Sequence, residues 1–489
     1  MGAPENAMTS DVIVVGAGAA GSWAAKELAE RGLEVTVLDA GPLVAAPDGT
    51  GLRRRPVQSH CYACTEADAH LFVDDLDNPY EVAPGTSFRW IRARQVGGRM
   101  HTWGRTSPRM EDDEFKAASA DGVGADWPLA AADLAPAYAR VEEFLDVRQV
   151  PLIAAERALQ EAIEARWPTR RVEASQSACR EPLRPLQAAL ATGRVTLLAD
   201  TIAARLPVER GGERVSGVEV VDRRSGARGE LRARAVVLCA SALESTRLLL
   251  NSAGGDHPNG LANSSGALGR HLMDHTYGIN FEGLAPARRA GAEEEAGDGG
   301  ILPGFRNVTE PIADFRRSYE VEFGVLPGTG RRSRLRREVR DSFWIAAFGE
   351  MLPDPENRVE VDPDRTDAWG IPTLLVTARH SDNERAMARD QIATLREMCA
   401  AAGFEITGGE AALAPVGMAS HEMGTARMGA DPATSVLNSW NQSWDVPNLF
   451  VTDAASFTSN GRRNPTLTIM ALTVRACAHL ADQLEDGAR

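Results

Sequence analysis

The sequence predicts an α/β protein in which a Rossmann-like dinucleotide-binding domain holds an inserted α+β substrate domain built on a mostly antiparallel sheet. Three observations support this fold class. A strand, a glycine-rich turn and a helix occupy residues 12–28, strand–helix pairs recur near residues 236–252 and 448–484, and the region between the last two alternates or runs apolar with aromatic residues. Alternating strands and helices indicate a parallel sheet, whereas successive strands without helices indicate an antiparallel one.

The first strand–turn–helix unit carries a nucleotide-binding fingerprint. Val12–Val15 is a β-branched run typical of a buried parallel strand. Gly16, Gly18 and Gly21 then form G-x-G-x-x-G. The first glycine permits the tight turn, the second lets the backbone approach a pyrophosphate, and the third lets the following helix, Ala20 to Leu28, pack closely on the strand.

An acidic residue follows the second strand. Val35–Leu38 is apolar and β-branched, and Asp39 comes directly after it. At this position a carboxylate accepts both hydroxyls of the adenosine ribose and disfavours a 2′-phosphate. FAD and NAD share this fingerprint. Flavoproteins that also bind a nicotinamide usually carry a second copy, and no second G-x-G-x-x-G follows in this chain, so we expect one bound dinucleotide, which would be FAD.

The middle of the chain predicts the inserted domain. Residues 277–284, 318–326 and 342–352 have strand patterns, and a helix is expected from about 383 to 402. We therefore expect an FAD-binding domain over 1–275, with insertions near 45–90 and 145–190, a substrate-binding domain over 276–410, and the rest of the FAD-binding domain over 411–489. The charged, glycine-rich stretch near 287–300 predicts a mobile surface loop, with a lid over the site as the alternative.

Composition excludes several classes of function. The formal charge of −15 repels phosphate backbones and anionic lipid surfaces, so a nucleic-acid-binding or membrane-binding protein is not expected. No signal peptide or membrane span is evident, and six cysteines in 489 residues suit a reducing compartment, so we expect a cytoplasmic enzyme. The pair Cys61 and Cys64 lacks a second ligand pair at zinc spacing, and no metal is expected.

The second strong signal lies near the C-terminus. It consists of S-H-E-M-G-T-A-R-M-G around His421 and the run N-L-F-V-T-D-A-A-S-F-T-S-N-G-R-R-N-P-T-L-T-I-M that contains Asn464. With the N-terminal fingerprint, these segments resemble the glucose-methanol-choline (GMC) oxidoreductases, closest to the branch of pyranose 2-oxidase and bacterial glycoside oxidases. In that family a histidine and an Asn or His about forty residues later face the flavin together, which implies these roles for His421 and Asn464.

Further segments match the family in order along nearly the whole chain. R-Q-V-G-G-R-M-H-T-W-G at 94–104 resembles its flavin-contacting loop, and D-W-P-L at 126–129 and L-G-R-H-L-M-D-H at 268–275 are similar to its landmarks. E-N-R-V-E-V-D-P-D at 356–364 resembles a strand of the family's substrate-domain sheet.

The chemistry explains the two catalytic residue types. Hydride transfer from a carbinol carbon to flavin N5 requires the hydroxyl proton to leave, so a base such as the His421 imidazole is needed near that oxygen. The Asn464 amide is expected to stabilise the developing alkoxide, although it could instead serve only as a helix N-cap. Pro465 and Thr466 open the last helix, whose N-terminal amides are expected against the flavin.

The residues expected to bind FAD come from both motifs and from the flavin-contacting loop. They are Gly16, Gly18, Ala19, Ala20, Gly21, Asp39, Ala40, Arg94, Val96, Gly97, Gly98, His101, Thr102, Trp103, Gly104, Ile202, Asp453, Ala454, Asn464, Pro465 and Thr466.

The sequence departs from relatives that attach FAD covalently. In those proteins a histidine occupies the position that is Thr102 here, and His101 is one place short. We therefore expect dissociable FAD, with His101 packing nearby.

The expected reaction is oxidation of an alcohol on a sugar, glycoside or aminosugar, with oxygen or a quinone-like molecule as the second electron acceptor. Arg462 and Arg463 either shape the substrate's site or face solvent. The alternatives are a non-redox, FAD-containing lyase of the same family and a catalytically silent flavin-binding protein. The choice between oxidase and dehydrogenase stays open, as does the oligomeric state, a homo-oligomer included.

Overall fold

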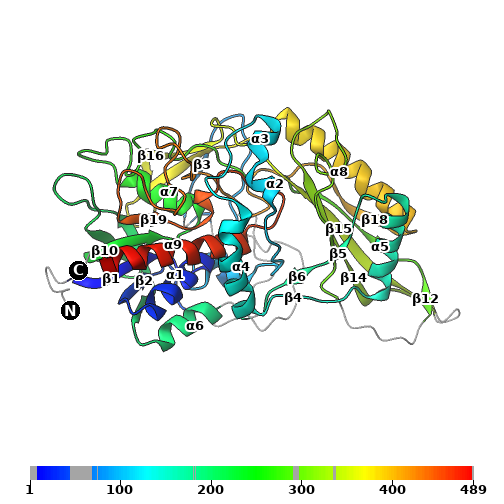
Figure 1. Ribbon diagram of the computed structural model, residues 1–489, viewed down its shortest axis with the longest axis horizontal. Helices are drawn as coiled ribbons and strands as arrows, with labels where there is room; N and C mark the ends of the chain where they lie inside the picture. Colours follow the sequence, from blue (N-terminus) through cyan, green and yellow to red (C-terminus); the bar gives the residue numbers. More distant parts are fainter. Residues whose placement is uncertain are drawn as a thin grey trace.

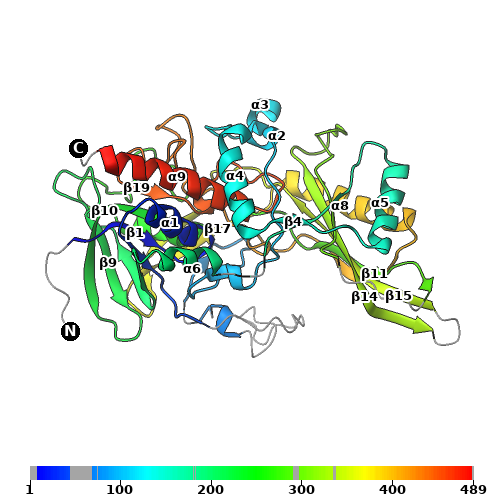
Figure 2. The same ribbon diagram turned by 60° about the horizontal axis from the view of Figure 1, so that its bottom comes forward.

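The computed structural model describes residues 8–44, 69–73, 75–76, 78–179, 181, 183–289, 297–333 and 338–486. Two bodies lie side by side (Figure 1): one surrounds β1, β10 and α9, and the other surrounds β14, β15 and α8. Figure 2 shows α4 (Ala131–Leu145) standing between them and the β14–β15 hairpin extending away from the first body. Cys61 and Cys64 lie outside the described residues.

The first body is built on a seven-stranded sheet. Its strands are, in spatial order, β7 (Val195–Leu198), β2 (Val35–Leu38), β1 (Met8–Val15), β10 (Arg228–Leu238), β9 (Gly217–Asp222) and β8 (Thr201–Arg205), with β19 (Leu449–Val451) also paired to β10. β7, β2, β1, β10 and β19 run parallel, whereas β9 and β8 are antiparallel additions. Because Val12 and Val14 are buried on one face and Ile13 and Val15 on the other, the central strand is apolar throughout.

Helices cover this sheet. α1 (Ala19–Glu30) packs against α9 (Thr466–Asp486) and α6 (Arg184–Ala191), and α4 packs against α9. α7 (Ala242–Asn251) follows β10 directly. The parallel sheet and its helices confirm the predicted Rossmann-like domain.

The second body is built on an antiparallel sheet, as predicted. Its strands are, in spatial order, β18 (Glu405–Ala411), β11 (Ile279–Leu284), β15 (Glu338–Gly349), β14 (Tyr319–Ser333), β13 (Gly300–Leu302) and β5 (Glu173–Ala174), with β12 (Arg288–Arg289) paired to β15. α8 (Asp382–Ala401) and α5 (Ala154–Arg166) pack on it.

The two faces of β14 differ in character. Tyr319, Val321 and Phe323 are buried in one apolar core with residues of α5 and α8. Glu320 and Glu322 alternate with them and therefore lie on the opposite face of the sheet. This opposite face is the one that reaches the cavity described below.

One assignment from the sequence differs from the structure. β16 (Arg358–Thr366) and β17 (Pro372–Thr377) pair with β3 (Glu81–Val82) in a separate three-stranded sheet. Val359, from the segment matched to the substrate-domain sheet, belongs to the apolar core of the first body, where β16 contacts α7. Conversely, α5 and β5 precede residue 276 but belong to the second body.

The remaining elements are short. They are β4 (Arg148–Gln149), β6 (Gln176–Ser177), α2 (Asp112–Phe115), α3 (Ala117–Asp121), and the 3-10 turns η1 (Ala69–Leu71), η2 (Gly98–His101) and η3 (Ala454–Ser456). Within the described ranges, no helix is both long enough and apolar enough to cross a membrane.

Candidate active site

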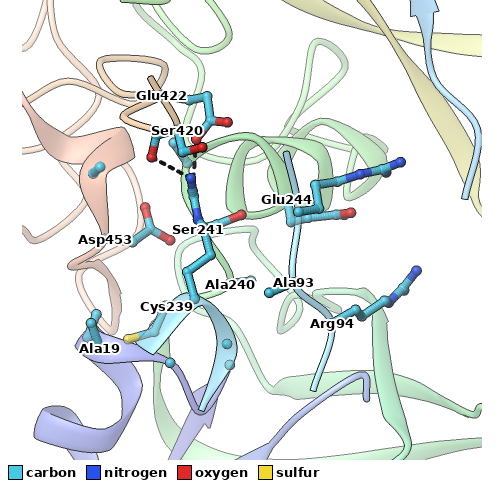
Figure 3. Close-up of a pocket in the computed structure, with 18 of the residues that line it drawn as sticks. Ala19, Ala93, Arg94, Cys239, Ala240, Ser241, Glu244, Ser420, Glu422 and Asp453 are labelled. Carbon is cyan, nitrogen blue, oxygen red and sulfur yellow. Dashed lines mark hydrogen bonds and ion pairs between the residues drawn. The ribbon is translucent and has the colours of Figure 1, made fainter. Parts of the chain in front are cut away.

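A cavity of about 730 Å³ opens where the parallel strands end. Gly16, Asp39, Cys239 and Asp453, which line it, each follow the carboxyl end of a parallel strand. Figure 3 shows Ala19, Cys239 and Asp453 around one side of this space, with Arg94 and Glu244 on the other. Ligands of open α/β sheets bind at such strand ends.

The glycines of the fingerprint shape one end of the cavity. Gly16 has φ +99°, and a Cβ there would lie 2.4 Å from the Cys239 carbonyl oxygen. A Cβ on Gly21 would lie 1.7 Å from the Gly16 carbonyl oxygen, so α1 approaches β1 only because Gly21 has no side chain. A Cβ on Gly18 would meet nothing within 4 Å, and Gly18 lines the cavity. The space beside Gly18 and the uncapped N-terminus of α1 fit a pyrophosphate.

Asp39 supplies the acidic group at this end. Its Oδ2 accepts a hydrogen bond from the Ala17 amide at 3.0 Å, and its Oδ1 accepts one from the Gly41 amide at 2.9 Å. Burial raises the pKa of Asp39 to about 6, and these two amides oppose the shift. The carboxylate is thereby fixed at the cavity wall, as ribose recognition requires. The site fits the adenosine and pyrophosphate parts of FAD.

His421 lies at another part of the same cavity, on a loop held by one buried carboxylate. Asp274 Oδ2 accepts from the Gly417 amide at 2.7 Å and from the Ala419 amide at 3.2 Å, and its Oδ1 accepts from the His421 amide at 3.0 Å. Burial and the neighbouring Glu422 raise the pKa of Asp274 to about 7. Asp274 therefore sets the backbone position of His421.

A second histidine determines the tautomer of His421. His275 Nε2 lies 2.9 Å from the Gly461 carbonyl oxygen, which can only accept, so this nitrogen carries hydrogen. Burial lowers the pKa of His275 to about 4, so at neutral pH its Nδ1 has a lone pair. That Nδ1 lies 2.9 Å from His421 Nδ1, which must therefore donate. The proton on the neutral His421 ring thus sits on Nδ1, and Nε2 keeps its lone pair.

The protonation state of His421 favours this arrangement. Burial, with contributions from His275 and Arg99, holds the pKa of His421 well below its usual value. The ring is therefore neutral at pH 7. It lines the cavity with an unprotonated nitrogen that can accept a proton.

Asn464 lines the same cavity, two residues before α9 begins. Its Nδ2 donates to Glu322 Oε1 at 2.6 Å. An N-cap side chain would instead accept from a backbone amide of α9, and among the described hydrogen bonds Asn464 makes none of that kind. Glu322 thus holds the Asn464 amide and leaves its second N–H group for another acceptor.

The second body contributes the wall opposite the strand ends. Tyr277, Glu322 and Phe348 line the cavity, and the rings of Tyr277 and Phe348 lie 5.9 Å apart. Glu322 and Phe348 belong to the sheet face that α5 and α8 leave uncovered, and Tyr277 lies just before β11. The cavity therefore lies between the two bodies.

Arg99 connects two other loops at the cavity. Its guanidinium donates to Glu422 Oε2 at 2.8 Å and to the Ser420 carbonyl oxygen. Ser420 and Glu422 flank His421, so Arg99 ties the flavin-contacting loop predicted from sequence to the histidine loop.

The structure brings most of the residues expected to bind FAD to this cavity. Those that line it are Gly16, Gly18, Ala19, Ala20, Asp39, Ala40, Arg94, Gly98, Thr102, Trp103, Gly104, Ile202, Asp453, Ala454, Asn464, Pro465 and Thr466. Gly21, Val96, Gly97 and His101 are not among the lining residues. His101 Nε2 instead lies 2.8 Å from the Val96 carbonyl oxygen, behind the loop.

Arg462 and Arg463 are both buried, so neither faces solvent. Arg462 pairs with Asp113 and Glu111, and Arg463 pairs with Glu111 and Glu320 Oε2. They neutralise acidic residues behind Asn464 and are not among the cavity-lining residues.

Two groups were missed by sequence reasoning: Glu322, which lines the cavity, and His275, which lies behind His421. His275 lies in the quoted segment 268–275, but no role was assigned to it, because its bond to His421 spans 146 residues. Glu322 had a visible signal: two glutamates at alternate positions of an otherwise apolar strand imply that one strand face meets a polar site.

Comparisons with known proteins agree with this geometry. Residues 11–262 match the FAD dependent oxidoreductase family model, and residues 353–473 match the GMC oxidoreductase model. The chain belongs to the GMC oxidoreductases. It is thus an FAD-dependent enzyme that oxidises alcohol groups.

Individual GMC relatives span nearly the whole chain. The 2-methyl-1,2-propanediol dehydrogenase of Mycolicibacterium austroafricanum is 28% identical, covering 98% of this chain and 96% of its own. The C-glycoside 3-oxidase of Arthrobacter globiformis is 25% identical, and the match covers 97% of this chain and 95% of that protein. The crystal structure of pyridoxine 4-oxidase from Mesorbium loti superposes with a TM-score of 0.63 at 21% identity, covering 97% and 99%, which supports the fold.

Proposed function

We propose that this GMC oxidoreductase oxidises an alcohol group of a sugar, glycoside or aminosugar, with His421 as the base that removes the hydroxyl proton. The observation that carries the proposal is the unprotonated Nε2 of His421 in the same cavity as Asn464. Bound FAD supplies the acceptor for the hydride that leaves the carbinol carbon.

The side chains at the cavity accept the proton and stabilise the charge that develops on the substrate. As the hydroxyl group loses its proton to His421 Nε2, negative charge develops on the oxygen. The free N–H of Asn464 is placed to donate to that oxygen, because Glu322 holds the other N–H. The carbinol thereby becomes a carbonyl, one proton resides on His421, and the imidazolium is stabilised by the chain that His275 makes to Gly461.

The wall from the second body supports a sugar-like substrate. Tyr277 and Phe348 offer apolar ring faces, and Glu322 offers a hydrogen-bond acceptor. A pocket with few polar groups among aromatic side chains suits a small polyol. The relative named C-glycoside 3-oxidase supports the same substrate class. The second electron acceptor is oxygen or a quinone-like molecule.

The test is anaerobic mixing of the FAD-loaded enzyme with sugars, glycosides and aminosugars, followed by readmission of air or a quinone. We expect loss of the visible flavin absorbance with at least one alcohol and its return with an acceptor. Turnover of a substrate without flavin bleaching would point to a non-redox lyase. Protein that stays colourless after FAD addition would point to a silent relative.

A further inference from the structure

We propose that the substrate carries a protonated amine one or two carbons from the oxidised alcohol, and that the Glu322 carboxylate binds this amine. The inference rests on the proposed function and narrows its substrate class. It follows from how Glu322 is placed and from the charges around it.

Glu322 is the acidic side chain that the second body presents to the cavity. It lies on the sheet face opposite the α5 and α8 core and lines the cavity together with Tyr277 and Phe348. Its Oε1 accepts from Asn464 Nδ2 at 2.6 Å. With the described residues, Glu322 makes no other hydrogen bond or ion pair, so its second oxygen is open to a ligand.

The neighbouring cations are committed to other acids. Arg463 forms ion pairs with Glu111 and Glu320, and Arg462 forms ion pairs with Asp113 and Glu111. Across the cavity, Arg99 bonds Glu422. Among the residues that the structure describes, the group bonded to Glu322 is therefore the neutral Asn464 amide, and Arg463 acts on it only at longer range.

A buried carboxylate without a cation is unfavourable. Burial raises the pKa of Glu322 to about 7, and the Asn464 bond and nearby Arg463 only partly oppose this. A substrate ammonium group would supply the missing charge and add charge-assisted hydrogen bonds. A neutral hydroxyl could also donate to Glu322, but it would leave the charge unpaired.

The shared amide fixes how far the amine lies from the reacting oxygen. Glu322 Oε1 occupies one N–H of Asn464, and the other N–H points about 120° away. An alkoxide on that second N–H would lie about 5 Å from Oε1, given ordinary hydrogen-bond lengths. An ammonium bonded to Glu322 therefore fits on the carbon next to the carbinol or on the one after it.

The experiment compares matched substrates in the FAD-loaded enzyme. Methyl glucosides with an amine in place of the 2-, 3- or 6-hydroxyl are set against methyl glucoside, and kcat/KM is measured from anaerobic flavin reduction near pH 7. For at least one amine position we expect kcat/KM of the wild type to be about 10-fold or more higher for the amino glucoside than for methyl glucoside. We expect Glu322→Gln to lower the ratio of these two kcat/KM values by about 10- to 100-fold.

Two additional measurements distinguish direct contact of the amine with Glu322 from a general effect of removing a buried carboxylate. Glu320→Gln removes a carboxylate from the same strand face, but Glu320 does not line the cavity, so we expect it to change the ratio by less than threefold. Calorimetric binding of the preferred amino glucoside to the slow His421→Ala enzyme should weaken about 10-fold or more when Glu322→Gln is added. Flavin content and thermal melting verify that both variants are folded.

The outcomes are distinguishable. If neutral sugars reduce the flavin with a kcat/KM equal to that of every amino sugar, the amine assignment is wrong while the proposed oxidation stands. The same holds if Glu322→Gln leaves the ratio of the two kcat/KM values unchanged. If no alcohol of either kind reduces the flavin, the proposed function itself fails.

Discussion

Two histidines at the cavity illustrate how a single carbonyl oxygen can set the chemistry of a distant ring. Because the Gly461 oxygen only accepts, His275 must present a lone pair to His421, and His421 must present one to the cavity. Protonation of His275 at Nδ1 would place two N–H groups against each other, whereas protonation of His421 at Nε2 leaves the bond between the rings intact. The low pKa of His275 is therefore part of the arrangement.

Removing the base should separate cofactor binding from turnover. In His421→Ala we expect FAD to remain bound and the rate of flavin reduction to fall about 100- to 10,000-fold, which is the range for loss of a general base. Stopped-flow absorbance measures both. His479→Ala, outside the cavity, is the matched control. An undiminished rate in His421→Ala would exclude the proposed role.

The tautomer chain can be tested with two substitutions of His275. His275→Leu removes the acceptor for His421 Nδ1–H, and we expect flavin reduction to slow about 10- to 100-fold. His275→Gln offers an amide oxygen to His421 and an N–H group to Gly461, so it should recover much of the rate. Equal rates for the two variants would indicate that His275 serves packing alone.

At the scale of elements, loops at strand ends supply the catalytic side chains, and buried carboxylates hold these loops in place. Asp274 does this for residues 417–421. Asp453, after β19, accepts from the Ala455 amide and from Ser245. The loops therefore have fixed shapes despite lacking regular structure.

Asp274→Asn should loosen the His421 loop. The substitution turns one acceptor oxygen into a donor that faces backbone N–H groups, so we expect a loss of about 1–3 kcal/mol in the free energy of unfolding. Flavin reduction should also slow. Urea unfolding and stopped-flow absorbance measure the two effects. The exposed Asp431→Asn, which also removes an acceptor of a backbone amide, should change neither.

The sequence predicted where strands and helices lie better than it predicted which of them pack together. The second strand has the predicted bounds, and the last helix begins at the predicted Thr466, because periodicity and helix signals are local. The segment 356–364, which contains most of β16, was assigned to the wrong sheet, because the local sequence of a strand does not encode which sheet it joins. Likewise, His421 and Asn464 carried motifs, but Glu322 acquires its role only through contact across 142 residues.

At the scale of the whole molecule, buried acids should shape stability as a function of pH. Burial raises the pKa of Asp274, Glu322 and Glu350 to about 7. Their folded-state pKa exceeds the unfolded value, so the folded protein holds more protons, and stability falls as pH rises toward 8. Burial lowers the pKa of His275 and His271 to about 4, so these groups reduce stability below about pH 6.5.

The midpoint of thermal unfolding should therefore decrease between pH 6.5 and 8. Scanning calorimetry at constant ionic strength measures it, and Glu322→Gln should reduce the slope. A midpoint that rises over this interval would contradict the burial of these carboxyl groups.

FAD should dissociate from the denatured chain. Thr102 occupies the position that carries the attachment histidine in some relatives, and His101 is directed to the Val96 carbonyl oxygen behind the loop. Mass spectrometry of the denatured protein should give the mass of the polypeptide alone, 52.4 kDa. An added flavin mass would contradict this expectation.

The order of strands in the first sheet has a consequence for biosynthesis. β10 pairs with β1 on one side and with β19 on the other, and β11 to β18 lie between β10 and β19 in the chain. A polypeptide that stops before Leu449 therefore leaves one edge of β10 without its partner and also lacks Asn464. Premature stop codons anywhere upstream of β19 should leave no partially active product.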